Sequence, residues 1–449
     1  MIVFKIIKAA FSLLLFFLNP MTWIHWSKSK ERLHNEFYWI WLKYRCFVLH
    51  KLSYSKIIRR ISKKRRRGET VHVAFIVFDT SKWSVDSVYR EFNNLPGYDT
   101  TIFVFPDPQF PGGKASSVKF SAEFFQKKGY RVEYGYDPEK QIYKSGTIWK
   151  DYDIVFFDNP WLESAPVLQM EYIGKYALTC YIPYGFMAAD ETQMHYMMPN
   201  HAFAWKVFAE TPWQKEQFQI HNILKGANVE SFGYPKLDTY GIEVSNPDRV
   251  WKSGLNPNSH RIIWAPHWTV YNSAVIGQFS TFHLIYEKML DYAKSHPETD
   301  WLFKPHPVLR ETIISQNLMT VEQVDEYYQQ WAEMPNGQVC LDGKFWDYFK
   351  TSDALITDSI SFLIEYLPTK KPIFRLASEH SSGFNEQTKQ IIKDYYLGNC
   401  FEDVVSFINE VILNRNDYNY DKRMQALESL PNIGTAGRMI VQYLNQQFE

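Results

Sequence analysis

The sequence has few cysteines and lacks an uninterrupted apolar run of membrane-spanning length. Its four cysteines are scattered singly, at spacings that fit neither a disulfide framework nor a zinc site. This favours a reducing, cytoplasmic setting. The apolar stretch at 9–18 is about half of the ~20 residues that a spanning helix needs. No small-residue cleavage site follows at 19–23, so a secretory signal peptide is not indicated either.

Internal repeats and low-complexity tracts are also missing, and no acidic pair of the D-x-D type follows a predicted strand in the second half. We therefore predict that the protein uses neither a metal ion nor another cofactor. A chain of 449 residues exceeds one ordinary core, while 45% apolar residues exclude wholesale disorder. Two domains with additional segments are expected.

Acidic and basic residues are equal in number, 49 of each, but they are distributed unevenly. Residues 1–67 hold sixteen Lys or Arg and only two acids, Glu31 and Glu36, whereas residues 68–449 carry 33 basic and 47 acidic residues. A basic head on an acidic body predicts an acidic partner for the head, either nucleic acid or an anionic membrane surface.

The composition of residues 1–67 favours the membrane. Aromatic residues such as Trp23 and Trp26 are interleaved with basic ones, and aromatic side chains prefer the headgroup level of a bilayer. We predict a peripheral, monotopic membrane-anchoring segment on the cytoplasmic face. A solvated basic linker is the alternative, and an apolar N-terminus argues against nucleic acid as the partner. The basic residues expected at the membrane are Arg59, Arg60, Lys63, Lys64, Arg65, Arg66 and Arg67.

Short apolar runs rich in β-branched residues alternate with amphipathic stretches through the rest of the chain, which is typical of parallel strands in βαβ units. The first half contains five such runs, at 71–78, 100–104, 131–134, 154–157 and 177–182. The pattern restarts in the second half, at 261–264, 301–304, 338–341, 354–357 and 372–375.

A segment rich in Pro, Gly, Asn and Ser at 241–260 separates the two halves and is expected to be an interdomain linker. We therefore predict an α/β protein of GT-B type, in which two doubly wound Rossmann-like domains face each other across a cleft. The predicted domains are an N-terminal Rossmann-like domain at 68–243 and a C-terminal Rossmann-like domain at 244–449, to which the family resemblance given below assigns the acceptor and the nucleotide donor, respectively.

Three predicted strands of the second half end in polar clusters, and α/β sheets bind ligands at these carboxyl ends. They are His267 after the first strand, Lys304 and His306 after the second, and Thr357, Asp358, Ser359 and Ser361 after the third. A helix starting near Ser359 would direct backbone N–H groups at a phosphate. The cations would neutralise a diphosphate leaving group, and Glu365 would accept hydrogen bonds from a ribose.

Each cluster also has a structural explanation. A histidine between prolines is commonly structural, a Thr-Asp-Ser sequence after a strand is an ordinary helix N-cap, and a single glutamate is commonly a surface residue. The order in which the clusters follow one another is what favours a ligand site.

Five segments in this order resemble motifs of the CDP-glycerol glycerophosphotransferases of teichoic acid and capsule synthesis. The resemblance covers roughly residues 175–380. The similar segments are Gly233–Asp238 (G-x-P-R-x-D in the family), Ile263–Trp268 (Y-A-P-T-W), Lys304–Pro307 (R/K-P-H-P), Ser352–Ser361 (S-D-x-L-I-T-D-Y-S-S) and Lys371–Phe374 (K-P-I).

The resemblance implies a GT-B fold and a CDP-polyol donor held by the C-terminal domain. In the family's reaction an acceptor hydroxyl attacks the donor phosphorus attached to glycerol, and CMP leaves. Carried over by position, His306 would stabilise the diphosphate, Ser361 and the backbone at Asp358 and Ser359 would cradle phosphate, and Glu365 would hold the ribose.

One departure concerns the general base. The family carries W-H-G at a strand end of its N-terminal domain, whereas Tyr184 stands at the position of that histidine. With an unperturbed pKa of about 10, a tyrosine is a poor base at neutral pH. Other candidates in the adjacent stretch are Asp190, Glu191 and His195.

The sequence thus predicts a transferase for glycerol phosphate, or a related polyol phosphate, from a CDP-activated donor to a lipid-linked or polymeric glycan acceptor in cell-surface polymer synthesis. One alternative is a GT-B glycosyltransferase that uses a nucleotide sugar. The other is a non-catalytic membrane-bound scaffold that has lost its base, which Tyr184 would favour and the retained Lys304, His306, Asp358 and Ser361 oppose.

Overall fold

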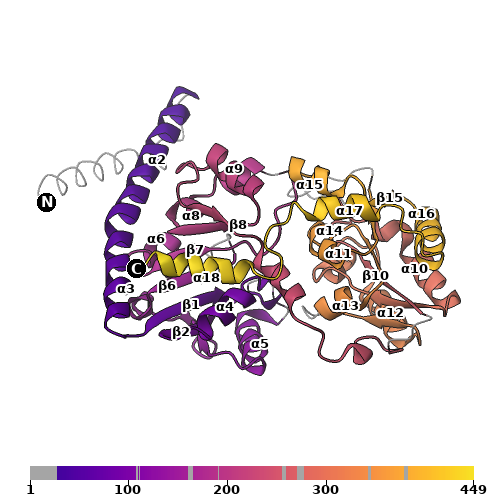
Figure 1. The fold of residues 1–449 in the computed structure, drawn as a ribbon. Coiled ribbons are helices and arrows are strands. Elements are labelled where there is room, and N and C mark those ends of the chain that lie inside the picture. The colour runs from indigo at the N-terminus through magenta and orange to yellow at the C-terminus, as the bar shows by residue number, and fades with distance from the viewer. Residues whose placement is uncertain are drawn as a thin grey trace, which may run out of the picture.

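The computed structural model describes residues 28–107, 110, 112–159, 165–190, 192–254, 259–270, 278–341, 345–378 and 383–449, with the backbone alone at 28–36 and 192. Two α/β domains lie side by side, each built on a parallel sheet (Figure 1). The predicted α/β, GT-B-like architecture is confirmed.

The first sheet has seven parallel strands in the order β3-β2-β1-β6-β7-β8-β9. Its central strands are short apolar runs buried on both faces, as parallel sheets covered by helices require. The strands are β1 (Val71–Val77), β2 (Tyr98–Val104), β3 (Val132–Tyr134), β6 (Ile154–Phe157), β7 (Leu178–Tyr181), β8 (Lys206–Ala209) and β9 (Val229–Ser231), with a small hairpin of β4 (Tyr136–Asp137) and β5 (Ile142–Tyr143) beside them.

The second sheet has six parallel strands in the order β12-β11-β10-β13-β14-β15. In each sheet the strand order reverses direction beside the first strand, between β1 and β6 and between β10 and β13, as in a doubly wound fold. The strands are β10 (His260–Ala265), β11 (Thr299–Phe303), β12 (Gly337–Val339), β13 (Ala354–Thr357), β14 (Ile373–Leu376) and β15 (Tyr396–Gly398).

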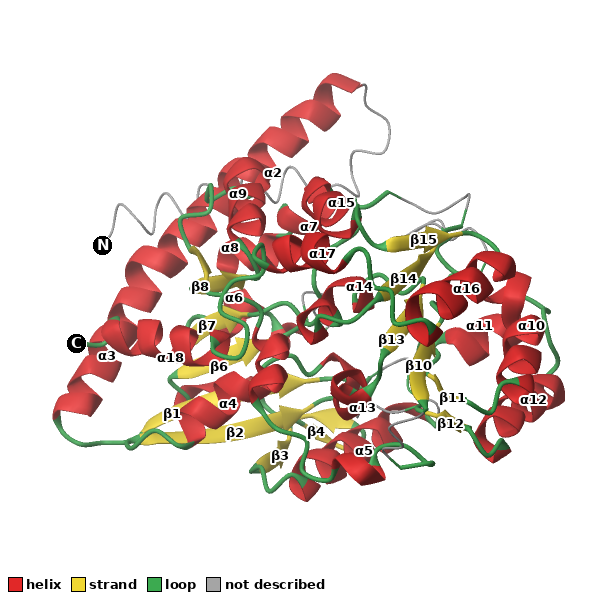
Figure 2. Cartoon of the chain, turned by 45° about the vertical axis from the view of Figure 1, so that its right-hand side comes forward, coloured by secondary structure: helices red, strands yellow, loops and turns green. Residues whose placement is uncertain are grey.

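Helices cover both faces of the sheets (Figure 2). One of them, α12, shows why its boundary falls where it does: the Thr320 hydroxyl accepts from the Gln323 N–H and the Gln323 side chain accepts from the Thr320 N–H, a capping box. The helices after the head are α4 (Asp86–Asn93), α5 (Gly113–Lys127), α6 (Met170–Ile173), α7 (Thr192–Tyr196), α8 (Pro199–Phe203), α9 (Pro212–His221), α10 (Phe282–Ser295), α11 (Leu309–Ser315), α12 (Val321–Glu333), α13 (Trp346–Thr351), α14 (Phe362–Glu365), α15 (Glu386–Ile392), α16 (Phe401–Phe407), α17 (Tyr420–Leu427) and α18 (Ala436–Gln446).

The described part of the basic head is a continuous helical rod along the edge of the first domain that faces away from the second (Figure 1). It consists of α2 (Lys28–Val48), a π-helical stretch (Leu49–Tyr54) and α3 (Ser55–Arg66). Its inward side belongs to the first domain's core, where Tyr54 is fully buried and donates its hydroxyl to the Phe203 carbonyl oxygen at 2.6 Å. The head is thus packed on the first domain rather than tethered to it.

No helix in the described ranges combines the length and the apolarity needed to cross a membrane. The apolar and Trp-rich stretch at 1–27, on which part of the membrane prediction depends, lies outside the described residues.

The chain crosses between the domains twice. It enters the second domain through 3₁₀ turns at Pro235–Gly241 and Pro247–Arg249, and it returns with α18, the yellow helix that lies on the first domain in Figure 1. The predicted boundary at 243/244 lies between the last strand of the first sheet and the first strand of the second. The C-terminal helix, however, contributes Ile440, Val441 and Leu444 to the first domain's core.

Candidate active site

Asp358 holds together the loops at the reversal point of the second sheet. Its Oδ1 accepts from the His267 N–H at 2.5 Å, and its Oδ2 accepts from the N–H and hydroxyl of Thr281 at 2.6 and 2.8 Å. Burial raises the pKa of this carboxyl to about 6, although the three hydrogen bonds oppose the rise. Asp358 therefore joins the end of β13 to the loop after β10 and to the start of α10. These three segments border the crevice at the reversal point of the second sheet.

His306 and His267 lie against each other in this crevice, with ring centroids 5.2 Å apart. The Val308 N–H donates to Nδ1 of His306 at 3.2 Å, so the neutral ring carries its proton on Nε2 and can donate from there. Burial, together with the neighbouring His267, Lys304 and Lys82, lowers the pKa of His306 well below its usual value.

His267 lies deeper and is buried. Its Nδ1 pairs with the Thr269 hydroxyl at 2.8 Å, and burial lowers its pKa to about 3. The ring is therefore neutral at physiological pH. Its ring packs against that of His306, and its contact with the donor phosphates stays a prediction.

Lys304 is buried at the end of β11. Its Nζ donates to the Pro305 carbonyl oxygen at 3.3 Å and lies 5.6 Å from the centre of the Phe345 ring. The structure thus brings together Lys304, His306, His267 and Asp358, the polar residues that the sequence placed at three separate strand ends.

Two of the groups assigned to phosphate are engaged within the crevice wall. The Thr357 hydroxyl donates to the Ala265 carbonyl oxygen at 2.6 Å and accepts from the Ser359 N–H at 2.9 Å. These bonds tie β13 to β10 and occupy the Ser359 amide. Ser361, at the N-cap of α14, makes no side-chain cap hydrogen bond and is half-buried.

Glu365 is fully buried and pairs with a residue of the hinge, the connection at 235–249 between the two domains. Its Oε1 accepts from Lys236 Nζ at 3.0 Å, and its backbone carbonyl accepts from the Tyr240 hydroxyl at 2.7 Å. Its Oε2 has no hydrogen-bond partner in the described structure. Because buried polar atoms are nearly always paired, this oxygen is a candidate acceptor for a ligand hydroxyl. The partner Lys236, which belongs to the Gly233–Asp238 segment, was not foreseen.

The first domain contributes the loop after β1, and it approaches the second domain's crevice. Lys82 pairs with Asp79 at 3.4 Å and lies 5.8 Å from the centre of the Tyr184 ring, and its charge also acts on His306. Tyr184 is half-buried, and its carbonyl oxygen accepts from the Tyr234 hydroxyl at 2.9 Å. Tyr184 therefore lies beside the crevice, at the family's histidine position.

The other predicted bases lie elsewhere. Asp190 is exposed, and its described contacts are with the second domain at Gly383, whose carbonyl oxygen accepts the Asp190 N–H at 3.0 Å. His195 is buried, with its ring against Tyr196 and His201, and burial lowers its pKa to about 4. Glu191 lies outside the described residues. Neither Asp190 nor His195 makes a described contact with His306 or Lys304.

Sequence analysis missed a carboxyl group at the end of β6. Asp158 follows Phe157 directly, is 3% exposed, and has an Oδ2 without a hydrogen-bond partner among the described residues. Burial raises the pKa of Asp158 well above its usual value, and the charges of Lys82 and Lys236 oppose the rise. A single aspartate after a strand carries no local signal, but the strand order identifies it as a residue of the first sheet's reversal point.

A cavity of about 130 Å³ lies between the two domains. The loop after β1, the hinge and the start of α13 form its walls, which combine cations with aromatic rings. Its lining includes Trp83, Arg90, Phe124, Lys128, Lys236 and Trp346.

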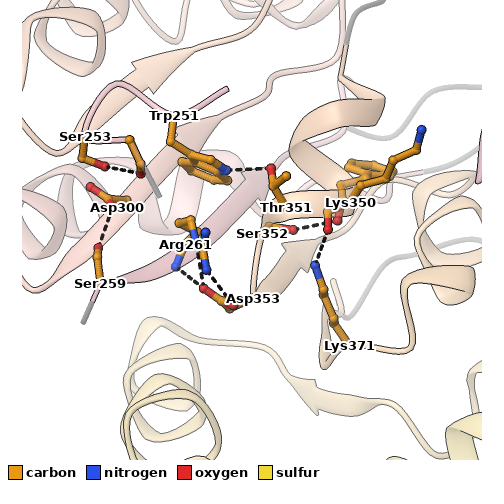
Figure 3. Close-up of polar contacts among 12 residues, drawn as sticks. Trp251, Ser253, Ser259, Arg261, Asp300, Lys350, Thr351, Ser352, Asp353 and Lys371 are labelled. Carbon is orange, nitrogen blue, oxygen red and sulfur yellow. Dashed lines mark hydrogen bonds and ion pairs between the residues drawn. The ribbon is translucent and has the colours of Figure 1, made fainter. Parts of the chain in front are cut away.

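The amino ends of the second sheet, by contrast, serve structure. Asp353 accepts three bonds from Arg261, from its backbone N–H at 2.8 Å, its Nε at 3.1 Å and its Nη2 at 3.4 Å (Figure 3). Lys371 donates to the Lys350 carbonyl oxygen at 2.7 Å, and burial lowers its pKa to about 8. These first residues of the S-D-x-L-I-T and K-P-I segments therefore lie at the edge away from His306 and fix the strands.

The seven basic residues assigned to the membrane divide into two groups. Arg60 and Lys64 pair with the buried Asp153, and Arg65 donates to the Asn445 carbonyl oxygen at 2.8 Å. Arg59, Lys63, Arg66 and Arg67 are exposed.

No group of three or more His, Cys, Asp or Glu side chains is arranged to hold a metal ion within the described ranges.

A sequence profile of the family described as CDP-glycerol:poly(glycerophosphate) glycerophosphotransferase matches residues 187–434, more than half of the chain. The chain belongs to this family. It is accordingly a transferase of the CDP-glycerol glycerophosphotransferase type, as the five motifs predicted. No curated protein sequence matched.

Solved structures support the fold. The wall teichoic acid polymerase TagF is 13% identical over 89% of this chain and 97% of its own, with a TM-score of 0.56. A variant of TagF with CDPG is 12% identical over 89% of this chain and 96% of its own, with a TM-score of 0.53. A UDP-GlcNAc 2-epimerase from Neisseria meningitidis bound to UDP-GlcNAc is 12% identical over 84% of this chain and 100% of its own, with a TM-score of 0.50.

Proposed function

We propose that this protein transfers glycerol phosphate, or a related polyol phosphate, from a CDP-activated donor to a lipid-linked or polymeric glycan in cell-surface polymer synthesis, with release of CMP. The observation that carries the proposal is the buried Glu365, whose Oε2 has no hydrogen-bond partner among the described residues, in the domain that also holds His306 and Lys304. Family membership and the TagF similarity support a CDP-glycerol-like donor.

In this proposal the second domain binds the donor. Glu365 Oε2 accepts hydrogen bonds from the ribose, while Lys304 and the Ser361 hydroxyl approach the phosphates. The Nε2–H of His306 donates to the diphosphate oxygen on which negative charge develops as CMP leaves. Donors fixed before the reaction stabilise such charge without reorganisation. The negative diphosphate would raise the low pKa of His306 and strengthen this bond.

The first domain receives the acceptor, whose hydroxyl attacks the phosphorus attached to glycerol. The cavity of about 130 Å³ offers aromatic faces such as Trp83 and Trp346 and cations such as Arg90 and Lys128. This combination suits a polyol phosphate or a glycan chain, because rings pack on sugar faces and cations pair with phosphates. The reaction needs no cofactor in this scheme, and we propose none.

We further propose that the protein binds peripherally to the cytoplasmic face of the membrane through the outward side of α2 and α3, and not to nucleic acid. Ile40, Phe47 and Leu52 are about half exposed there. Exposed Lys56, Arg59 and Lys63 continue the same side, and no acidic residue occurs between 37 and 68. Apolar and basic groups together match an anionic bilayer.

The test of the reaction is a donor panel. Purified protein is incubated with CDP-glycerol, CDP-ribitol and common nucleotide sugars, with and without lipid-linked acceptors, and the released nucleotide is measured. We expect acceptor-dependent CMP release from a CDP-polyol. Release of UDP or GDP from a nucleotide sugar would instead favour a glycosyltransferase, and release from no donor would favour a scaffold.

A further inference from the structure

The reaction proposed above lacks a general base among the residues that sequence analysis singled out. Tyr184 stands where the family has histidine, Asp190 is exposed at a different interdomain contact, and His195 is buried among aromatic rings. The acceptor hydroxyl must nevertheless lose its proton near the phosphorus it attacks. A carboxylate or imidazole within hydrogen-bond reach of that hydroxyl is required.

The topology of the first sheet indicates where to look. Its strand order reverses between β1 and β6, and the loops after these two strands flank the crevice in which doubly wound sheets bind ligands. The loop after β1 carries Lys82, and the residue after β6 is Asp158. The second sheet has its own reversal between β10 and β13, where Asp358 ties the loops around His306.

The charges around Asp158 connect it to both reversal points. Lys82 acts on Asp158 and also on His306, while Lys236 acts on Asp158 and pairs with Glu365. Both reversal points thus share the charge of Lys82, and Lys236, whose charge acts on Asp158, is bonded to Glu365 at 3.0 Å. The other titratable groups that act on Asp158 or feel its charge are Asp79 and Tyr181.

We propose that Asp158 is the general base of the transfer reaction. The inference rests on the proposed function. The acceptor O–H bond breaks and its proton passes to the unpartnered Oδ2 of Asp158, while the acceptor oxygen forms a bond to the phosphorus that bears glycerol. The bond between that phosphorus and the bridging oxygen breaks, and CMP leaves with the electron pair. Asp158 then returns its proton to solvent.

The environment of Asp158 suits this task. An ordinary aspartate is a weak base near neutrality, and burial raises the pKa of Asp158 well above its usual value. Lys82 and Lys236 oppose the rise, which keeps the ionised form accessible. An acceptor that enters by the 130 Å³ cavity would reach Lys236 and the loop that carries Lys82.

Glu210, a second buried carboxyl group of the first domain, is less well placed to act as the general base. Glu210 follows β8, and burial raises its pKa to about 7. Its Oε1, however, already accepts the Met187 N–H at 3.0 Å, and the titrating groups on which its charge acts are tyrosines such as Tyr181 and Tyr196. In the described part of the chain, neither His306 nor Lys236 is among the groups that interact with the charge of Glu210. It therefore provides a matched control.

The test compares Asp158→Asn with Glu210→Gln, since both changes are isosteric and affect a buried carboxyl group at a strand end. With CDP-glycerol and acceptor, Asp158→Asn should lower kcat by about 100-fold or more, the usual contribution of a general base. Glu210→Gln should stay within about threefold. Donor affinity, measured by calorimetry, should be unchanged in Asp158→Asn, because a general base contacts the acceptor hydroxyl and not the donor.

A pH profile separates a base from a structural carboxylate. In the parent protein kcat should fall as pH drops below the pKa of Asp158, and this acidic limb should be absent in Asp158→Asn. Asp158→Glu should keep the limb, and formate should partly restore Asp158→Ala. If Asp158→Asn fails to fold, formate rescue of Asp158→Ala tests the same role of the carboxyl group.

A folded Asp158→Asn protein with parental turnover and an unchanged acidic limb would overturn the inference alone. Lack of turnover of every CDP-polyol by the parent protein would overturn the proposed function and, with it, the role of Asp158.

Discussion

The ring of His306 has one orientation in the crevice because the Val308 N–H donates to its Nδ1. The neutral ring then carries its proton on Nε2. We predict that His306→Ala lowers turnover by about 100-fold or more, since one preorganised donor to developing charge is typically worth that much. The midpoint of thermal unfolding should change little, because the ring is only half-buried.

Steady-state CMP release and calorimetric scanning measure the two effects. His260→Ala is the matched control, since His260 begins β10 at the opposite edge of the sheet. Equal turnover in both variants would assign His306 a structural role.

Buried neutral histidines make the fold sensitive to acid. Burial lowers the pKa of His195 to about 4, whereas in the unfolded chain it is near 6.5. The unfolded state therefore binds the proton first. The contribution of neutral His195 to the free energy of unfolding is fully present above pH 6.5 and is lost as pH falls toward 4. The free energy of unfolding then declines by up to about 1.4 kcal/mol per pH unit for this one group.

We predict that His195→Phe flattens the decline of unfolding free energy between pH 6.5 and 4. Urea unfolding at several pH values would show this. His221→Phe, at the end of α9, should leave the slope as in the parent protein. An unchanged slope in His195→Phe would mean that this histidine is protonated equally in both states.

Individual site residues were predictable only where the strand order could be guessed from sequence. His306, Lys304 and Asp358 follow apolar runs, so their convergence followed from parallel pairing. The partner of Glu365 was not predictable, because Lys236 is 129 residues away. The hydrogen bond from the Thr357 hydroxyl to the Ala265 carbonyl oxygen was not predictable either, because it depends on which strand lies beside β13.

At the scale of elements, α3 is fastened to the first sheet by one buried carboxylate. Asp153 is 1% exposed and accepts from Lys64 Nζ at 2.7 Å, from Arg60 Nε at 3.2 Å and from the His72 N–H at 3.0 Å. Asp153→Asn leaves both cations without a counter-charge. Hydrogen bonds to charged groups contribute about 1.5–3 kcal/mol, and the partial exposure of Arg60 and Lys64 places the expected loss of stability near the lower end.

Urea unfolding and hydrogen exchange along α3 would measure this loss. Asp151→Asn, an exposed aspartate two residues away, is the control and should be neutral. Unaltered exchange in α3 of Asp153→Asn would show that apolar packing by Ile57 and Ile61 and the bonds from Arg60 and Arg65 to backbone carbonyl oxygens suffice to hold the helix.

The strands of both sheets were largely predictable, because each buried parallel strand is a short apolar run. Three strands of these two sheets were missed, β8, β9 and β15. β9 and β15 are edge strands and β8 lies beside β9. All three are only three or four residues long, and polar residues such as Lys206 and Glu230 pair with each other there. The inward packing of α2 and α3 was also missed, since their basic residues suggested a free segment.

At the scale of the whole molecule, the second crossing between the domains, the return through α18, could not be assigned from the sequence pattern. Asp238, in the hinge, accepts from the N–H groups of Ala436 and Gly437 at 2.9 and 2.7 Å and so caps the helix that returns to the first domain. Gly437 lies against Ser87, where an added Cβ would be 2.4 Å from the Ser87 hydroxyl oxygen. The requirement for glycine there comes from an element 350 positions earlier in the chain.

The proposed membrane attachment would be a property of the whole molecule, because only the folded first domain divides the basic residues between an inner and an outer side. Arg60, Lys64 and Arg65 pair inward, so exposed Lys56, Arg59 and Lys63 should provide the electrostatic attraction. Replacing these three by Gln should cost about 1 kcal/mol each, or roughly 100-fold in affinity for anionic vesicles.

Vesicle co-sedimentation at low and high salt measures the effect, since screening weakens exposed charges. The matched control replaces three exposed lysines of the second domain, Lys288, Lys294 and Lys393, by Gln and should bind as the parent protein does. Neutral vesicles test the apolar contribution of Phe47 and Leu52, which should remain in the triple variant. If the two triple variants bound anionic vesicles equally, the outward side of α2 and α3 would not be the membrane surface, and residues 1–27 would be the segment to test next.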